Sequence, residues 1–245
     1  MKVYYDLHIH TGLSPCADKD MTPNNIVNMA ILNELDVIAI TDHNTCGNAA
    51  AVMEAASGTP LTVLCGMEVE TAEEVHVICL FAALEQGLAF DKAVAATMPQ
   101  VANKPAIFGT QLYYDADDEV LGTCDRLLMT ATALSLPALV DMVKGYGGVA
   151  IPAHIDRPSN SVMTNLGFIP PELDVAFIEF SKHTDPLGYF AEHQRLFFKA
   201  YGTLVSSDAH YLGDIAEKKH YLTFDTRPDA KAFIRRLSEG AGRDA

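Results

Sequence analysis

Short apolar runs alternate with amphipathic stretches along all 245 residues of the chain. The runs that predict strands are 3–10, 36–40, 61–65, 74–81, 149–152, 175–180 and 203–206. Helices are predicted at 23–34, 47–56, 90–98, 116–132, 137–146, 187–201 and 228–239. The first of these helices has a clear start signal, with Thr22 as N-cap and Pro23 at the first helical position. This alternation without linker or repeat predicts a parallel sheet, either open or closed into a barrel.

Polar residues follow nearly every predicted strand. His8 and His10 are two apart, which places both side chains on one face of a strand. Asp208 and His210 repeat the spacing after another strand. The full set near strand ends is His8, His10, Asp42, His43, Glu68, His76, His154, Asp208 and His210. Taken singly, each is explained as a capping carboxylate or a surface imidazole. Together they indicate an active end of the sheet, because barrels collect functional residues at the carboxyl ends of their strands.

The residue types in this set point to metal chemistry. Imidazole and carboxylate together suit Zn, Mn and Fe. The set is too large for one tetrahedral ion, which takes about four ligands. The sequence therefore predicts two or three ions, bridged by a carboxylate.

Composition and net charge restrict the classes of partner that the protein can bind. Hydrophobic residues make up 49% of the chain, which favours a folded domain with a large core. The formal net charge of −15 disfavours long nucleic acid or an anionic membrane surface as a partner. It does not exclude an anionic substrate, since bound metal can reverse the local field. The sequence has no signal-peptide pattern, no apolar run of ~20 residues and five scattered cysteines without a CxxC motif, so we expect a reduced, cytoplasmic protein. Its oligomeric state is left open.

Six motifs, in order, resemble those of the PHP (polymerase and histidinol phosphatase) family. They are DLHIHT (6–11), TDHN (41–44), GMEV (66–69), His76, PAH (152–154) and SDAH (207–210). The resemblance covers roughly residues 3–211. It implies a distorted (β/α)7 TIM-like barrel as a single domain over 1–245, two or three divalent transition-metal ions (Mn, Fe or Zn) and phosphoesterase activity.

The resemblance also implies a ligand set. His8, His10, Glu68 and Asp208 would hold one ion, and Glu68 would bridge to a second ion shared with His76 and His154. His43 and His210 would hold a third ion with a ligand from the loop after His10. Asp18 is favoured for that ligand, but the loop is longer than in the family pattern, so Asp20 and Cys16 stay open. The family's further His before His154 is missing here, and Gln111 or water would take its place.

We therefore expect a phosphoesterase acting on a small phosphorylated metabolite or nucleotide. A hydroxide that bridges two ions would attack the phosphorus. Asp208 and His210 would be catalytic residues of this centre. Arg157 would bind phosphate, and His183 and Lys182 would hold substrate, with His183 also able to protonate the leaving group. Residues 85–145 would form the wall or lid of the site. The alternatives are an exonuclease or oligonucleotide phosphodiesterase, a catalytically weak metal-binding regulatory domain, and a related hydrolase of amides or lactones.

Overall fold

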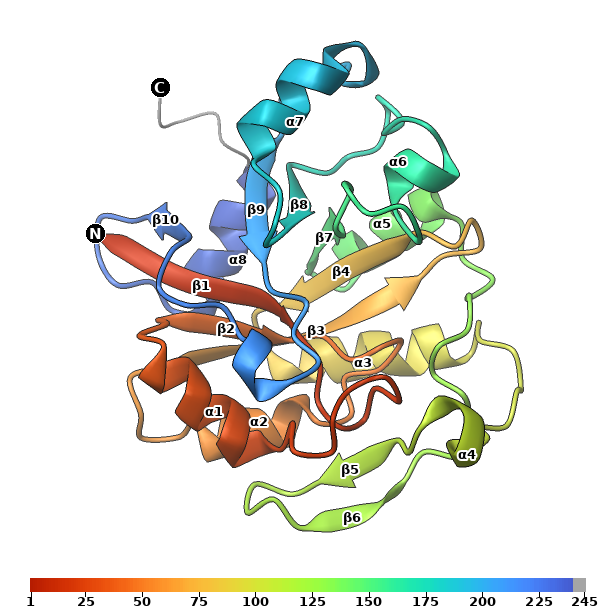
Figure 1. Ribbon diagram of the computed structural model, residues 1–245, viewed down its shortest axis with the longest axis vertical. Helices are drawn as coiled ribbons and strands as arrows, with labels where there is room; N and C mark the ends of the chain where they lie inside the picture. The colour runs from red at the N-terminus through yellow and green to blue at the C-terminus, as the bar shows by residue number, and fades with distance from the viewer. Residues whose placement is uncertain (240–245) are drawn as a thin grey trace.

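The computed structural model describes residues 1–239 and shows a mixed α/β domain (Figure 1). Its strands are β1 (Lys2–Ile9), β2 (Val37–Ile40), β3 (Thr62–Glu70), β4 (His76–Phe81), β5 (Leu112–Tyr114), β6 (Val120–Thr123), β7 (Val149–Pro152), β8 (Phe177–Ser181), β9 (Gly202–Ser206) and β10 (Tyr221–Thr223). Its α-helices are α1 (Pro23–Leu32), α2 (Ala49–Ala55), α3 (Leu84–Ala95), α4 (Pro105–Phe108), α5 (Leu136–Gly145), α6 (Val162–Asn165), α7 (Pro186–His193) and α8 (Ala230–Glu239), and two 3₁₀ turns are η1 (Gln194–Leu196) and η2 (Leu212–Asp214).

A curled six-stranded sheet forms the centre, in the order β10-β1-β2-β3-β4-β7. Strands β1, β2 and β3 run parallel, whereas β4 is antiparallel to both β3 and β7. Strands β8 and β9 form a separate parallel pair, which lies between β7 on one side and β1 on the other. The segment after β9 bridges β1 through Ala209 and Ile9, and Ile155, just after β7, donates its N–H to the carbonyl of Glu179 in β8. The sheet is thus a half-barrel whose open side faces β8 and β9 (Figure 1).

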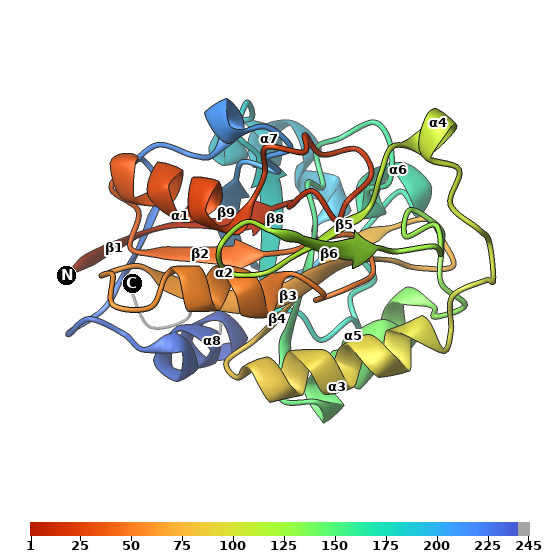
Figure 2. The same ribbon diagram turned by 90° about the horizontal axis from the view of Figure 1, so that it is seen from below.

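The strands alternate between two apolar cores. On β3, Val63 packs into the outer core with the surrounding helices, while its neighbour Leu64 packs into the inner core. Val77 and Ile78 on β4 divide in the same way. Helix α8 adds Phe233 to the inner core from beneath the sheet (Figure 2). Beyond this core, toward the carboxyl ends of β1 and β3, the inner face carries the residues of the candidate site.

A β-bulge re-aims the end of β1. Its pairing with β2 shifts register between Asp6 and Ile9. Before the shift Leu7 faces the inner core, and after it Ile9 belongs to the outer core. A bulge inserts an extra residue and changes which side chains share a face. His8 and His10 therefore point together toward the inside of the half-barrel.

Three expectations are corrected by the fold. The sheet is mixed rather than parallel, since β4 runs antiparallel to β3. The helix expected at 116–132 is instead the β5–β6 hairpin and an irregular segment, because Asp115 Oδ1 accepts the N–H groups of Asp117 and Glu119 in a turn. The helix expected at 187–201 ends at His193 and continues as η1. Among residues 1–239, no helix is both long and apolar enough to cross a membrane.

Candidate metal centre

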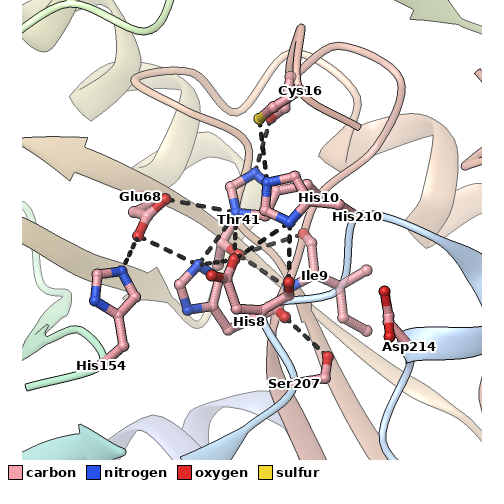
Figure 3. Close-up of polar contacts among 12 residues, drawn as sticks. His8, Ile9, His10, Cys16, Thr41, Glu68, His154, Ser207, His210 and Asp214 are labelled. Carbon is pink, nitrogen blue, oxygen red and sulfur yellow. Dashed lines mark hydrogen bonds and ion pairs between the residues drawn. The ribbon is translucent and has the colours of Figure 1, made fainter. Parts of the chain in front are cut away.

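Glu68 is the hub of the site. It lies on the inner face of β3, two residues beyond Gly66, and is 1% exposed. Its Oε1 lies 2.8 Å from His76 Nδ1, and five imidazoles in all come within 3.5 Å of the carboxylate: His8, His10, His43, His76 and His154. Burial opposes ionisation, but the surrounding imidazoles, His76 and His8 foremost, hold the pKa of Glu68 well below its usual range. The carboxylate therefore stays charged among the imidazoles, and Figure 3 shows it beside His154.

The antiparallel course of β4 explains how His76 reaches Glu68. His76 is the first residue of β4 and pairs with Glu70 near the end of β3. The start of an antiparallel strand lies at the same edge as the end of its partner. His154 arrives differently, just beyond the end of β7, with a positive φ of 27°.

Asp208 is the second carboxylate of the site. It follows β9 with a left-handed φ of 51°, and its Oδ1 lies 3.1 Å from both His8 Nε2 and His10 Nε2. This buried oxygen has no hydrogen-bond partner, although its side chain is 6% exposed. Burial disfavours the charged carboxylate, but His8 and His10 hold the pKa of Asp208 well below its usual range. A buried oxygen without a partner is costly and calls for an ion or water.

The spacing of the ligand atoms fits a metal ion. His8 Nε2 and His10 Nε2 lie 3.1 Å apart, and their separations from the Glu68 and Asp208 oxygens run from 3.1 to 3.5 Å. A tetrahedral ion with N and O ligands at about 2.0–2.1 Å separates neighbouring ligand atoms by about 3.3–3.4 Å. Three sets of ligand atoms lie within 4.8 Å of one another: His10, His43 and His210; His8, His10 and Glu68; and His43, Glu68 and His76. The donor set thus fits more than one ion.

The loop after His10 brings a cysteine into the site. Cys16 Sγ lies 3.3 Å from His43 Nε2 and 3.1 Å from His210 Nε2 (Figure 3). Asp18, which the sequence favoured for this place, instead accepts the N–H of Asp20 and belongs to none of the three ligand sets found in residues 1–239. Burial opposes ionisation of Cys16, but the hydrogen bonds from His210 and His43 outweigh it and lower the pKa of the thiol to about 7. Asp20 is exposed.

Gln111 does not replace the missing histidine. Its buried amide Nε2 donates to the carbonyls of Cys124 and Arg126, at 2.8 and 2.6 Å. Its Oε1 accepts the N–H of Leu128 at 2.9 Å. The side chain thus holds the backbone of the 124–128 segment, which disfavours Gln111 as the ligand and leaves water, the other alternative, for that place.

Two supporting carboxylates sit behind the imidazoles. Glu179 Oε2, 3% exposed, lies 2.9 Å from His8 Nδ1 and accepts the N–H of His154 at 3.1 Å. The sequence reasoning missed it, although a single charge in the apolar run of β8 was a usable signal. Asp42 accepts the hydroxyls of Thr11 and Ser14, and Ser14 Oγ lies 2.9 Å from His10 Nδ1. Such partners fix the ring orientation of metal-binding histidines.

A pocket of about 190 Å³ opens beside these groups. Its lining comprises Cys16, His43, Glu68, His76, Met129, His154, Arg157, Ser159, Asn160, Asp208 and His210. Arg157 is 40% exposed, and its Nη1 lies 2.5 Å from Asp208 Oδ2. Lys182 and His183 are not among the lining residues of the described chain. Lys182 donates to the carboxylate of Asp214 at 2.8 Å, and His183 is exposed.

Comparison with known proteins shows a family likeness in the first part of the chain. The PHP domain model matches residues 6–119, which include the first four of the six motifs as far as His76. This first part of the chain is therefore similar to a PHP domain. The chain is 38% identical over 78 residues to the 5'-3' exoribonuclease Rnm of Salmonella typhimurium and to that of Escherichia coli. This match covers 31% of the chain and about a quarter (26%) of the length of each relative.

Solved structures share the fold of this chain. The lesion-specific endonuclease PfuEndoQ from Pyrococcus furiosus has a TM-score of 0.70 at 17% identity, over 99% of this chain and 57% of that one. A putative metal-dependent phosphoesterase from Bifidobacterium adolescentis has a TM-score of 0.59 at 19% identity, over 97% and 96% of the two chains. These likenesses agree with the mixed α/β half-barrel described above.

Proposed function

We propose that the protein is a metal-dependent hydrolase of phosphate esters. One observation carries the proposal: six imidazoles and the carboxylates of Glu68 and Asp208 gather beside a pocket that also contains an arginine. Imidazole and carboxylate ligands suit Mn, Fe and Zn, and phosphate esters are common substrates of such ions. The PHP domain match supports the same class of chemistry.

The proposed ligand roles follow the contacts. His8, His10, Glu68 and Asp208 would hold one ion. A second would lie between Glu68, His76 and His154, and a third beside His43 and His210. The course of the strands, from β1 through β2, β3, β4, β7, β8 and β9 back to β1, supports a distorted seven-stranded barrel around this centre.

The ions, when bound, supply Lewis acidity and lower the pKa of water. The chain's own residues set the geometry around them. Glu179 and the Ser14–Asp42 pair orient the two strand histidines. Arg157 pairs with Asp208 across the pocket, and its guanidinium would turn to phosphate oxygens in a bidentate contact once substrate enters. Asp208 and His210 would complete the reacting centre. The expected roles of Lys182 and His183 have no such geometric support.

The pocket favours recognition of a phosphoryl group and little more. Its volume of about 190 Å³ is below the ~300–1,000 Å³ of pockets that enclose a whole ligand. The remainder of the substrate would lie over the rim, where Met129 contributes from the 85–145 segment. Asn44 fixes this wall by donating to the carbonyls of Leu128 and Thr130. We therefore propose a small phosphorylated metabolite or nucleotide as substrate, with residues 85–145 shaping the choice.

Nuclease activity is the second candidate. The similar proteins named above are, by their names, an exoribonuclease and a lesion-specific endonuclease, which weakens the expectation drawn from the acidic composition. A pocket that takes one phosphoryl group also accepts the end of an oligonucleotide. The sparse cations at the pocket, Arg157 in the lining and Lys182 nearby already paired with Asp214, favour a chain end over a long track.

The test is a reconstitution screen. Metal-free protein would be loaded with Mn²⁺, Zn²⁺ or Fe²⁺ and assayed on phosphorylated metabolites, nucleoside 3′,5′-bisphosphates and labelled oligoribonucleotides. We expect metal-dependent release of phosphate or nucleotides that His10→Ala abolishes. His193→Ala is the matched control, because this imidazole lies on α7 and contacts the carbonyl of Tyr189. Metal-loaded protein that is silent on every substrate would overturn the proposal and favour a regulatory metal-binding domain.

A further inference from the structure

We propose that Cys16 is a thiolate ligand of the metal centre, and that with His43 and His210 it forms a position selective for Zn²⁺ or Fe²⁺ over Mn²⁺. The inference deepens the proposed function and relies on it only for the presence of ions. It gives the loop after His10 a ligand that differs chemically from the carboxylate expected there.

The geometry converges on the sulfur. Cys16 Sγ faces the Nε2 atoms of two different imidazoles, at 3.3 Å from His43 and 3.1 Å from His210. A tetrahedral zinc ion, with Zn–S of about 2.3 Å and Zn–N of about 2.0–2.1 Å, separates S and N ligands by about 3.5 Å. An opening of a few tenths of an ångström would therefore admit the ion.

A second observation supports a cation site here. His10, His43 and His210 offer ring nitrogens that all lie within 4.8 Å of one another. The rings of His10 and His210 stack with centroids 4.3 Å apart. Asp208, next to them, holds a buried oxygen that has no hydrogen-bond partner. Cys16 is not a member of this set, but its sulfur contacts two of the three imidazoles, His43 and His210.

The loop is held so that the sulfur stays in place. The N–H of Asp18 donates to the carbonyl of His210 at 2.8 Å. On the other side, Gly109 packs against the carbonyl of Pro15, and a Cβ at Gly109 would lie 2.1 Å from that oxygen. Gly109 also has a φ of +100°, which favours glycine. Cys16 is therefore clamped between two other segments of the chain.

The thiolate decides which ions the position takes. Thiolates favour Zn²⁺ and other softer ions, imidazoles suit Zn and Fe, and carboxylates suit Mn and Mg. The proposed ions at Glu68 have carboxylate ligands, whereas the ion at Cys16 would have sulfur and nitrogen. The centre would then hold different metals at different positions.

Cobalt reports a thiolate bond directly. Metal-free protein titrated with Co²⁺ should develop the near-ultraviolet charge-transfer absorption of a Co–thiolate bond. Cys16→Ser should lose this absorption and weaken one binding step by about 100-fold or more, since even outer partners of ligands are worth 10–100-fold in affinity. Cys16→Asp should keep the binding step, lose the absorption, and shift the metal taken up from an equimolar Zn²⁺ and Mn²⁺ mixture toward Mn²⁺.

Two matched variants complete the design. Cys124→Ser removes a thiol of similar exposure that contacts the carbonyl of Arg126 instead, and it should leave the absorption unchanged. Asp18→Asn should also leave it unchanged. Cobalt bound at full stoichiometry without the absorption, or unaltered absorption in Cys16→Ser, would overturn the inference.

The outcome is separable from the proposed function. A wild-type Co–thiolate absorption in a protein silent on all phosphate esters would retain the Cys16 ligand and reject the hydrolase. Hydrolysis in a protein without the absorption would do the reverse. A wild-type chain that binds no cobalt would overturn both.

Discussion

Glu179 offers the sharpest test of how the site is organised. Its buried Oε2 lies 2.9 Å from His8 Nδ1 and accepts the backbone N–H of His154 at 3.1 Å. One carboxylate oxygen thus sets a ring on β1 and the backbone after β7. With a proton on Nδ1, His8 presents the lone pair of Nε2 toward Glu68 and Asp208.

Two substitutions separate charge from geometry. Glu179→Gln keeps an oxygen that can accept from both donors but loses the negative charge. We expect metal affinity to fall about tenfold, or about 1.4 kcal/mol, at the lower end of outer-partner effects. Glu179→Ala also leaves the buried N–H of His154 without an acceptor. That variant should lose more affinity, and its metal-free form should be less stable by about 1–3 kcal/mol, or roughly 2–12 °C in Tm.

Competition with a chromophoric chelator measures the affinity, and thermal unfolding of the metal-free proteins measures the stability. Glu73→Gln is the control, since Glu73 accepts the N–H of Leu136 at the start of α5, apart from the site. Metal affinity within twofold of wild type in both Glu179→Gln and Glu179→Ala would contradict this role of Glu179. In that case Glu179 would orient neither the ring of His8 nor the backbone of His154.

Three further variants test neighbouring assignments. Arg157→Ala should raise KM for a phosphate ester by about tenfold or more while the metal content stays constant, and an unchanged KM would return Arg157 to the surface. Gln111→Ala should destabilise the protein by at least about 1–3 kcal/mol with unchanged metal stoichiometry, and a lost ion with normal stability would reinstate it as a ligand. His183→Ala should leave kcat and KM within twofold, because the residue is exposed and outside the pocket lining, and a large fall in kcat would restore its expected role.

The two-residue periodicity of strands allowed the sequence to predict which site residues share one face of the sheet. His8 and His10 share a face because they are two apart, and Glu68 continues the inner face that Leu64 occupies. Local patterns could not reveal the bulge in β1 or the antiparallel direction of β4, because both depend on how strands pair across the sheet. His76 reaches the centre only through that reversal.

The loops show the limit more clearly. Cys16 and Asp18 lie two residues apart, and only the path of the chain between His210 and Gly109 decides which one faces the imidazoles. The 116–132 segment has the polar content of an exposed helix, but Asp115 hydrogen bonds to the backbone and forms a hairpin turn instead. In both cases side chains compete for the backbone in ways that periodicity does not encode.

The placement of buried charge explains how an acidic chain can handle an anion. Glu68, Asp208 and Glu179 put three carboxylates in or against the site, and Arg157 offsets one of them. Asp18 and Asp42, by contrast, accept hydrogen bonds from residues of the loop after His10. With the imidazoles neutral, as metal ligation requires, these three carboxylates and Arg157 sum to 1 − 3 = −2, and two divalent ions would bring this set to about +2. Bound metal ions, rather than the global charge of −15, would therefore set the sign of the field that a phosphate ester meets at the site.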